Sequence, residues 1–200
     1  ASSFDHAGPM ARDVAGCVEL MEALVPGFGV GDVALDDLSL AVAWGEVPVR
    51  GTRVEFPTAE AVVPAFMREV GDVHRALYAE HAELYGENIR GKIERCIATG
   101  DGEYDAAVRA RGEHAERALA AIEGYDLLVT PTLSVAPPAA DAVELDIRAA
   151  LTLWTFPFNA LGWPVLALPA GTASIQVIGR PGEDALVLAA GLALEAALKA

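Results

Sequence analysis

"LTLWTFPFNALGWPVLALPAG", residues Leu151 to Gly171, carries no charged side chain, and three prolines interrupt it. A helix that crosses a bilayer needs about 20 consecutive apolar residues. Proline removes a helix donor and clashes with the preceding turn, so Pro157, Pro164 and Pro169 divide the stretch into shorter elements. We therefore predict a short helical piece that ends near Asn159 and then a strand, which together form core and pocket wall and do not span a membrane.

The sequence on either side of this stretch alternates between helical and strand patterns. Apolar residues recur at three- and four-residue spacing in the helical segments and alternate in the strand segments, and no repeat of 20 to 50 residues interrupts this order. The pattern predicts one α/β unit with a mixed central sheet flanked by helices. Strands are expected near 38–43, 126–130, 165–168 and 174–179, and helices within 9–27, 54–86 (interrupted at Pro64), 87–102, 103–124 and 182–200.

Composition narrows the possible partners and the cellular setting. Lys and Arg number 14 against 29 Asp and Glu, a formal charge of −15 that argues against a nucleic-acid partner, since nucleic acid has the same sign. Cys17 and Cys96 lie far apart and have no Cys or His neighbours at metal-ligand spacing, so we expect two reduced thiols and no metal. The first residues lack the regions of a signal peptide, and we expect a cytoplasmic protein.

Four segments taken in order carry a family resemblance. They are "FDHAGPMARDV", "YDLLVTPTLSVAPP", "TFPFNALGWPVLALPAG" and "IQVIGRPGEDALVLAAGLALE", which extend from Phe4 to Glu195. Together they resemble the C-terminal half of the amidase signature family. The resemblance implies part of a layered α/β/α fold with a mixed central sheet, and hydrolysis of a carboxylic amide to an acid and ammonia or an amine, without a cofactor.

In that family a serine nucleophile, a second serine in a cis peptide and a lysine carry out the chemistry, and a glycine-rich loop holds the oxyanion. A serine hydroxyl needs a base to take its proton, and the oxyanion needs fixed donors. The resemblance places all of this upstream of the "DHAGP" segment. The chain has Lys92 and Lys199 but no serine in a glycine-rich loop, so we predict that it contains no catalytic residue, that an N-terminal half absent from the chain supplies them, and that the chain alone is inactive.

The resemblance also implies that the segment around Phe158 and Asn159 lines the substrate cleft. Thr155, Phe158 and Asn159 are therefore our substrate-binding candidates, although aromatic residues in such a stretch are more often core. His6 follows Asp5, which permits an acid–base pair, but the favoured interpretation is a turn histidine bonded to the backbone, because no nucleophile accompanies it.

Two other functions remain open at this point. The chain could belong to an amidotransferase that acts with partner subunits on a charged tRNA, although "LTLWTFPFNALGW" is too apolar to favour glutamine. It could also be a domain that binds a ligand or partner without chemistry. The expected partners are a small amide substrate, the missing N-terminal half of the same protein, and a second copy of the chain, because a half-domain leaves strand edges uncovered.

Overall fold

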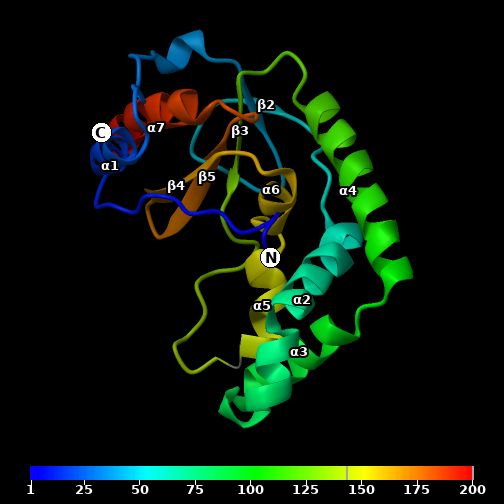
Figure 1. Cartoon of the computed structure of the whole chain (residues 1–200). Coiled ribbons are helices and arrows are strands. Elements are labelled where there is room, and N and C mark those ends of the chain that lie inside the picture. Colours follow the sequence, from blue (N-terminus) through cyan, green and yellow to red (C-terminus); the bar gives the residue numbers. More distant parts are fainter. Residues whose placement is uncertain (143, 200) are drawn as a thin grey trace.

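A computed structural model describes residues 1–142 and 144–199, and its centre is a five-stranded mixed sheet with the order β2-β1-β3-β5-β4 (Figure 1). β1 pairs with β2 and with β3 in parallel, whereas β5 pairs with β3 and with β4 in antiparallel orientation. The predicted α/β class and mixed sheet are confirmed. The strands are β1 Leu40–Val42, β2 Thr52–Arg53, β3 Leu127–Pro131, β4 Val165–Ala170 and β5 Ala173–Ile178.

Four of these strands overlap the predicted ranges, and β2 was not predicted. Its two residues are exposed, so they leave no apolar alternation to recognise. Pro64 was expected to interrupt a helix, but it lies in the first turn of one, where its missing N–H has no intrahelical partner to lose. The helices are α1 Val14–Leu24, α2 Val63–His81, α3 Glu87–Ala98, α4 Asp101–Ala121, α5 Glu144–Thr152, α6 Phe156–Leu161 and α7 Asp184–Lys199, with short 3-10 turns η1 Leu35–Asp37, η2 Glu60–Val62 and η3 Ala82–Leu84.

Strand β3 shows how the two faces of the sheet are covered. Leu127 and Val129 pack with residues of α1 and α7, whereas Leu128, between them, packs with α4 and α6 on the opposite face. Figure 1 shows these helices on the two sides of the sheet. Successive side chains of a strand point to opposite faces of the sheet. A strand that is buried on both faces, like β3, therefore needs consecutive apolar residues. None of the helices in the described part of the chain is long and apolar enough to cross a bilayer.

The uncharged stretch folds as its prolines predict. It contributes the end of α5, all of α6, and then β4. Gly162 ends α6 with a left-handed φ of 67°, and its N–H donates to the carbonyl of Phe158 (2.8 Å). Pro164 follows, and the chain leaves as the edge strand of the sheet.

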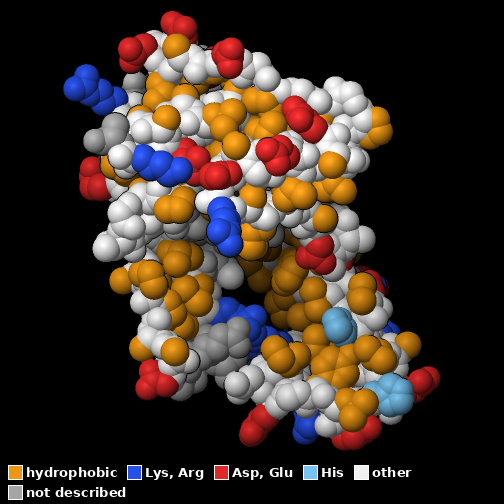
Figure 2. All heavy atoms as spheres, turned by 90° about the vertical axis from the view of Figure 1, so that its left-hand side faces the viewer, with side chains coloured by type: hydrophobic (Ala, Val, Ile, Leu, Met, Phe, Trp, Pro, Cys, Tyr) orange, Lys and Arg blue, Asp and Glu red, His pale blue; other side chains and the backbone are white. Residues whose placement is uncertain are grey.

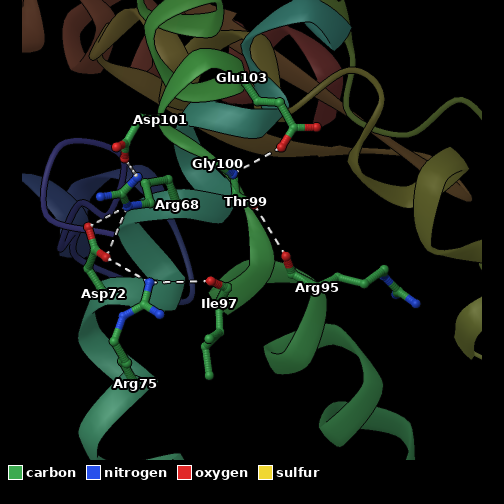
Figure 3. A network of polar contacts seen from close by, with 9 residues as sticks. All are labelled: Arg68, Asp72, Arg75, Arg95, Ile97, Thr99, Gly100, Asp101 and Glu103. Atoms are coloured by element: carbon green, nitrogen blue, oxygen red, sulfur yellow. Dashed lines mark hydrogen bonds and ion pairs between the residues drawn. The ribbon is translucent and has the colours of Figure 1, made fainter.

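Helices α2 and α3 lie beside the sheet, next to the start of α4, and charged contacts hold the three together (Figure 3). The guanidinium of Arg68 binds Asp72 one turn further along α2 (3.1 Å) and Asp101 at the start of α4 (2.6 Å). Arg75 donates to the carbonyl of Ile97 near the end of α3 (3.3 Å). The hydrogen bond from Arg68 lowers the pKa of Asp101, which keeps this carboxylate charged. These contacts fix where α3 lies relative to α2.

Gly71 provides a test of the close contact between α2 and α3. A Cβ at this position would lie 2.3 Å from the carbonyl oxygen of Cys96, which is backbone and cannot rotate away. We expect Gly71→Ala to lower the free energy of unfolding by about 1–3 kcal/mol, the usual cost of overpacking. The control Gly112→Ala in α4, which has open space, should raise it by about 0.5–1 kcal/mol because alanine favours the helix. Urea unfolding of both variants checks this, and equal effects would contradict it.

His114 provides a test of pH dependence. The side chain is buried in α4 at 1% exposure, and burial lowers its pKa, which the Pro157 backbone and Glu60 counteract only in part. The unfolded chain binds this proton near pH 6.5 and the folded chain only at lower pH. Folding stability is therefore fully present above about pH 6.5 and declines as the pH falls below it. Denaturant unfolding at pH 7.5 and 5.5 should show a smaller decline for His114→Gln than for the unchanged protein, and identical declines would refute the assignment.

Candidate functional site

Two cavities meet at Asn159, near the end of α6. The first, which we call the sheet-edge cavity, has a volume of about 430 Å³ and lies between residues 6–9, α1, α7 and the start of β4. The second, which we call the helical cavity, has a volume of about 550 Å³ and lies between α2, α3, α5 and α6. Figure 2 shows a hollow on one face of the molecule, with Lys and Arg side chains inside it and apolar side chains around it. Both volumes are in the range of small-molecule sites.

The helical cavity combines an apolar wall with a few polar groups, which is the usual composition of a ligand pocket. Its polar lining comes from four elements and the N-terminal segment. Cations come from α3, and a cation and a hydroxyl come from α5. A hydroxyl and an amide come from α6 and the residue before it, and one carboxylate each comes from η2 and the N-terminal segment. The apolar lining residues include Val63, Phe66, Met67, Leu153 and Phe156; the polar ones are Asp5, Glu60, Lys92, Arg95, Arg148, Thr152, Thr155 and Asn159.

The structure brings two of the three substrate-binding candidates to this cavity. Thr155 and Asn159 lie one turn apart and both line it. The Asn159 amide is exposed and makes no hydrogen bond within the described residues, so both its donor and its acceptor face are available. Phe158 is 1% exposed and packs instead against Phe56 and Trp44 in the core. It lines neither cavity and supports α6 from behind.

Arg111 of α4 fixes α6 and the N-terminal segment next to each other. Its Nε donates to the carbonyl of Ala160 (2.6 Å), and its other nitrogens donate to the Oγ and the carbonyl of Ser3 (2.7 Å each). Its guanidinium also lies 4.3 Å from the ring centre of Phe4, which is fully buried. Phe4 in turn stacks on Phe156 of the cavity wall (5.9 Å between ring centres). The wall of the helical cavity therefore depends on one arginine outside it.

Gln176 of β5 fixes the other end of α6. Its side chain is 2% exposed, and its Nε2 donates to Thr130 Oγ1 in β3 (2.9 Å) and to the carbonyl of Trp154 (2.7 Å). The indole of Trp154 stacks on Trp44 (6.0 Å between ring centres), and Trp44 holds a left-handed φ of 68°. Such a backbone costs about 1–3 kcal/mol at a non-glycine residue. The Trp44 Nε1 donation to the Phe56 carbonyl (3.0 Å) and the aromatic packing offset that cost.

No activated nucleophile lines either cavity in the described part of the chain. Neither lining contains a serine, and Ser3 is bound by Glu69 and Arg111. Cys96 lines the helical cavity, but burial raises the pKa of its thiol, which therefore stays protonated at neutral pH. The linings therefore have the composition of small-molecule sites.

Asp5 and His6 do not form an acid–base pair. The Asp5 carboxylate accepts a hydrogen bond from the backbone nitrogen of Ala1 (2.6 Å) and lines the helical cavity, whereas His6 lines the sheet-edge cavity. No hydrogen bond joins the two side chains among the described residues. His6 is thus placed beside Gly162 as part of a cavity wall and has no carboxylate to orient it.

Sequence reasoning missed the cationic side of the helical cavity. Lys92 and Arg95 are three residues apart on α3, and Arg148 lies in α5, more than fifty residues later. Their helical spacing was the only signal in the sequence, and charged residues on a helix are ordinarily solvated. Only the packing of α3 against α2 and of α5 beside them shows that the three side chains share a cavity.

Comparison with known proteins gives consistent matches. A family model described as "Amidase" matches residues 41–188. The AmiD protein of Mycobacterium tuberculosis, named as a candidate amidase, is 28% identical over 64% of this chain and 29% of its own length. A glutamyl-tRNA(Gln) amidotransferase subunit from Rhodospirillum rubrum is 27% identical over 98% of this chain and 54% of its own length. A crystal structure described as an amidase superposes with a TM-score of 0.82 at 26% identity and covers 98% of this chain and 54% of that chain.

The chain thus spans about half the length, or less, of the relatives that it matches. The alignment with the Rhodospirillum protein runs over 273 positions, although this chain has 200 residues. That relative therefore carries segments inside the aligned region that have no counterpart here.

Replacing Arg111 tests whether it holds the cavity wall. Arg111→Gln removes three hydrogen bonds from a charged donor, and we expect the free energy of unfolding to fall by about 1.5–3 kcal/mol. Hydrogen exchange at Asp5 and Gly162, whose amides are bonded in the segments that Arg111 joins, should accelerate more than at the sheet. Arg109→Gln, on the exposed side of α4, is the matched control and should change neither quantity. If the two variants behave alike, Arg111 does not have this role.

Proposed function

The chain belongs to the amidase family, and we propose that it forms the substrate-side portion of an enzyme that hydrolyses a carboxylic amide to an acid and ammonia or an amine. The observation that supports this most directly is the position of Asn159. The uncharged stretch that resembles the family also builds α6, and α6 presents Asn159 where the two cavities meet.

Thr155 and Asn159 have the chemistry to orient an amide. An asparagine side chain donates and accepts at once, so it can pair with both the N–H and the C=O of a substrate amide. The apolar wall formed by Phe66, Phe156 and Leu153 would take the acyl portion of the substrate. We propose Thr155 and Asn159 as direct contacts and Phe158 as their structural support.

The nucleophile in this proposal comes from outside these 200 residues. Hydrolysis by the serine, cis-serine and lysine chemistry of the family needs a nucleophile, its proton acceptor and oxyanion donors at one place. The relatives are about twice as long as the part that this chain matches, so the unmatched part is long enough to contain these groups. We propose that the N-terminal half of the same protein supplies it and completes the cavities around Asn159.

The edge strand β4 offers one place where that portion could pair. Val165 is 40% exposed, and β4 pairs on one side only, with β5. An unpaired apolar edge is a template for another strand. In this proposal the catalytic portion covers it, and in its absence a second copy of the chain competes for the same edge.

An amidotransferase activity is the second candidate. The Rhodospirillum relative, which is named as part of an amidotransferase, aligns with 98% of this chain, and the helical cavity has polar groups from α3 and α5 that the apolar stretch alone does not reveal. Glutamine would then be the ammonia donor. A domain that only binds its ligand would release no ammonia from any amide, either as the 200-residue chain or as part of a longer gene product.

Ammonia release from a panel of aliphatic and aryl amides, glutamine included, tests the proposal. The purified chain should show no turnover, since even the residual rate of a damaged serine site depends on an oxyanion hole. The longer native gene product should be active. In it Asn159→Ala should change substrate preference with little loss of stability, because the side chain is exposed. Phe158→Ala should lower the free energy of unfolding by about 3–5 kcal/mol instead, because it empties the core.

Two results would overturn this proposal. Steady turnover by the chain after all five serines are changed to alanine would show an independent catalytic site. A longer gene product that folds and releases no ammonia from any amide of the panel would instead support a binding domain.

A further inference from the structure

The helical cavity gathers positive charge on one side, in a chain whose net charge is −15. Lys92 and Arg95 line it from α3 and Arg148 lines it from α5. Lys92 Nζ and Arg148 Nε are shielded from solvent, and both residues have interactions within the chain. The same lining includes two carboxylates, Asp5 and Glu60, so its described side chains are three cations against two anions.

Arg95 is the cation that is left for a ligand. Its guanidinium makes no hydrogen bond or ion pair with any residue that the structure describes. Figure 3 shows its side chain extending away from the neighbouring charged network, in which only its backbone carbonyl takes part, as the acceptor for Thr99 Oγ1 (3.3 Å).

The carboxylates nearest to Arg95 in the sequence are all engaged elsewhere. Glu94 accepts from the hydroxyl of Tyr78 (2.6 Å), and Asp101 is bound by Arg68 (2.6 Å). Glu103 accepts from the backbone N–H of Gly100 (3.0 Å). None of these three carboxylates pairs with the Arg95 guanidinium within the described residues.

The shape of the cavity limits what the anion can be. An apolar wall of Val63, Phe66 and Met67 borders the cationic side, and Thr155 and Asn159 lie on α6 and just before it. A ligand that uses all three features has an anionic end, a short apolar body and an amide. Arginine binds a carboxylate with two parallel hydrogen bonds, which also fixes its orientation.

We propose that the helical cavity selects small amides that carry a carboxylate, with Arg95 binding the carboxylate and Asn159 the amide. The inference rests on the proposed function and names the substrate class for that site. The two carboxylates of the lining, Asp5 and Glu60, disfavour a second negative charge on the ligand, so a monoanion fits better than a dianion.

Binding to the 200-residue chain tests the proposal without any turnover. The probes are glutaramate, the monoamide of a five-carbon diacid, and glutaramide, the uncharged diamide of nearly the same shape, titrated by protein-observed NMR in a buffer without phosphate or carboxylate. We expect the dissociation constant of glutaramate to be at least tenfold lower, and to rise as NaCl increases from 20 to 500 mM. Acetate should bind more weakly than glutaramate, because it has neither the apolar body nor the amide.

Variants assign the effect to Arg95. Arg95→Gln should remove the preference for glutaramate over glutaramide, and Arg95→Lys, which keeps the charge, should retain part of it. Arg109→Gln removes a charge from the exposed face of α4 and should leave both affinities unchanged. Arg95 is exposed at the cavity wall, so the variants should keep the circular-dichroism spectrum of the unchanged chain.

Equal affinity for the two probes, or a preference that survives Arg95→Gln, would overturn the proposal. The result is independent of hydrolysis. An active longer protein that prefers neutral amides would refute only the assignment of the carboxylate, whereas selective binding by the chain beside an inactive longer protein would refute only the proposed amidase activity.

Discussion

The antiparallel pairing of β5 with β3 is the interaction on which the rest of the structure depends. It joins the β4–β5 hairpin to a sheet whose other strands, β1, β2 and β3, run parallel. The register places Gln176 opposite Thr130, so the two buried polar side chains meet and Gln176 can also reach the Trp154 carbonyl. A shift of one residue would turn Gln176 to the opposite, apolar face and leave its amide without partners.

From that pairing, a chain of contacts leads to the cavities. Gln176 holds the backbone just before α6, and Arg111 holds the backbone at its end through the carbonyl of Ala160. A helix of six residues has little stability of its own, and its position comes from these two partly buried polar contacts together with the packing of Phe158. Asn159 therefore lies on a short element that is fixed at both ends, as a group that orients a substrate should be.

Structural and ligand-binding groups lie in different parts of the molecule. Most side chains on the sheet faces are apolar and form the core, whereas the polar side chains that line the helical cavity lie on the helices and in the N-terminal segment. Arg95 and Arg68 show the contrast within a few turns of each other: Arg68 is paired with two carboxylates and holds helices together, whereas Arg95 extends from the same network without a partner in the described structure. One arginine is thus structural, and the other is available to a ligand.

The sequence by itself determined the order of helices and strands, because the spacing of apolar residues and the prolines at 157, 164 and 169 limit what each segment can form. Its motifs also pointed to the family and to Thr155, Phe158 and Asn159 as substrate-binding candidates. It could not decide whether Phe158 lies in the core or in a pocket wall, since an aromatic residue in an apolar helix is common in both. It could not show that Lys92, Arg95 and Arg148 share a cavity, nor that Arg111 connects Ser3 with Ala160. Those relations join residues far apart in the chain, and only the packing of helices against one another decides which side chains meet.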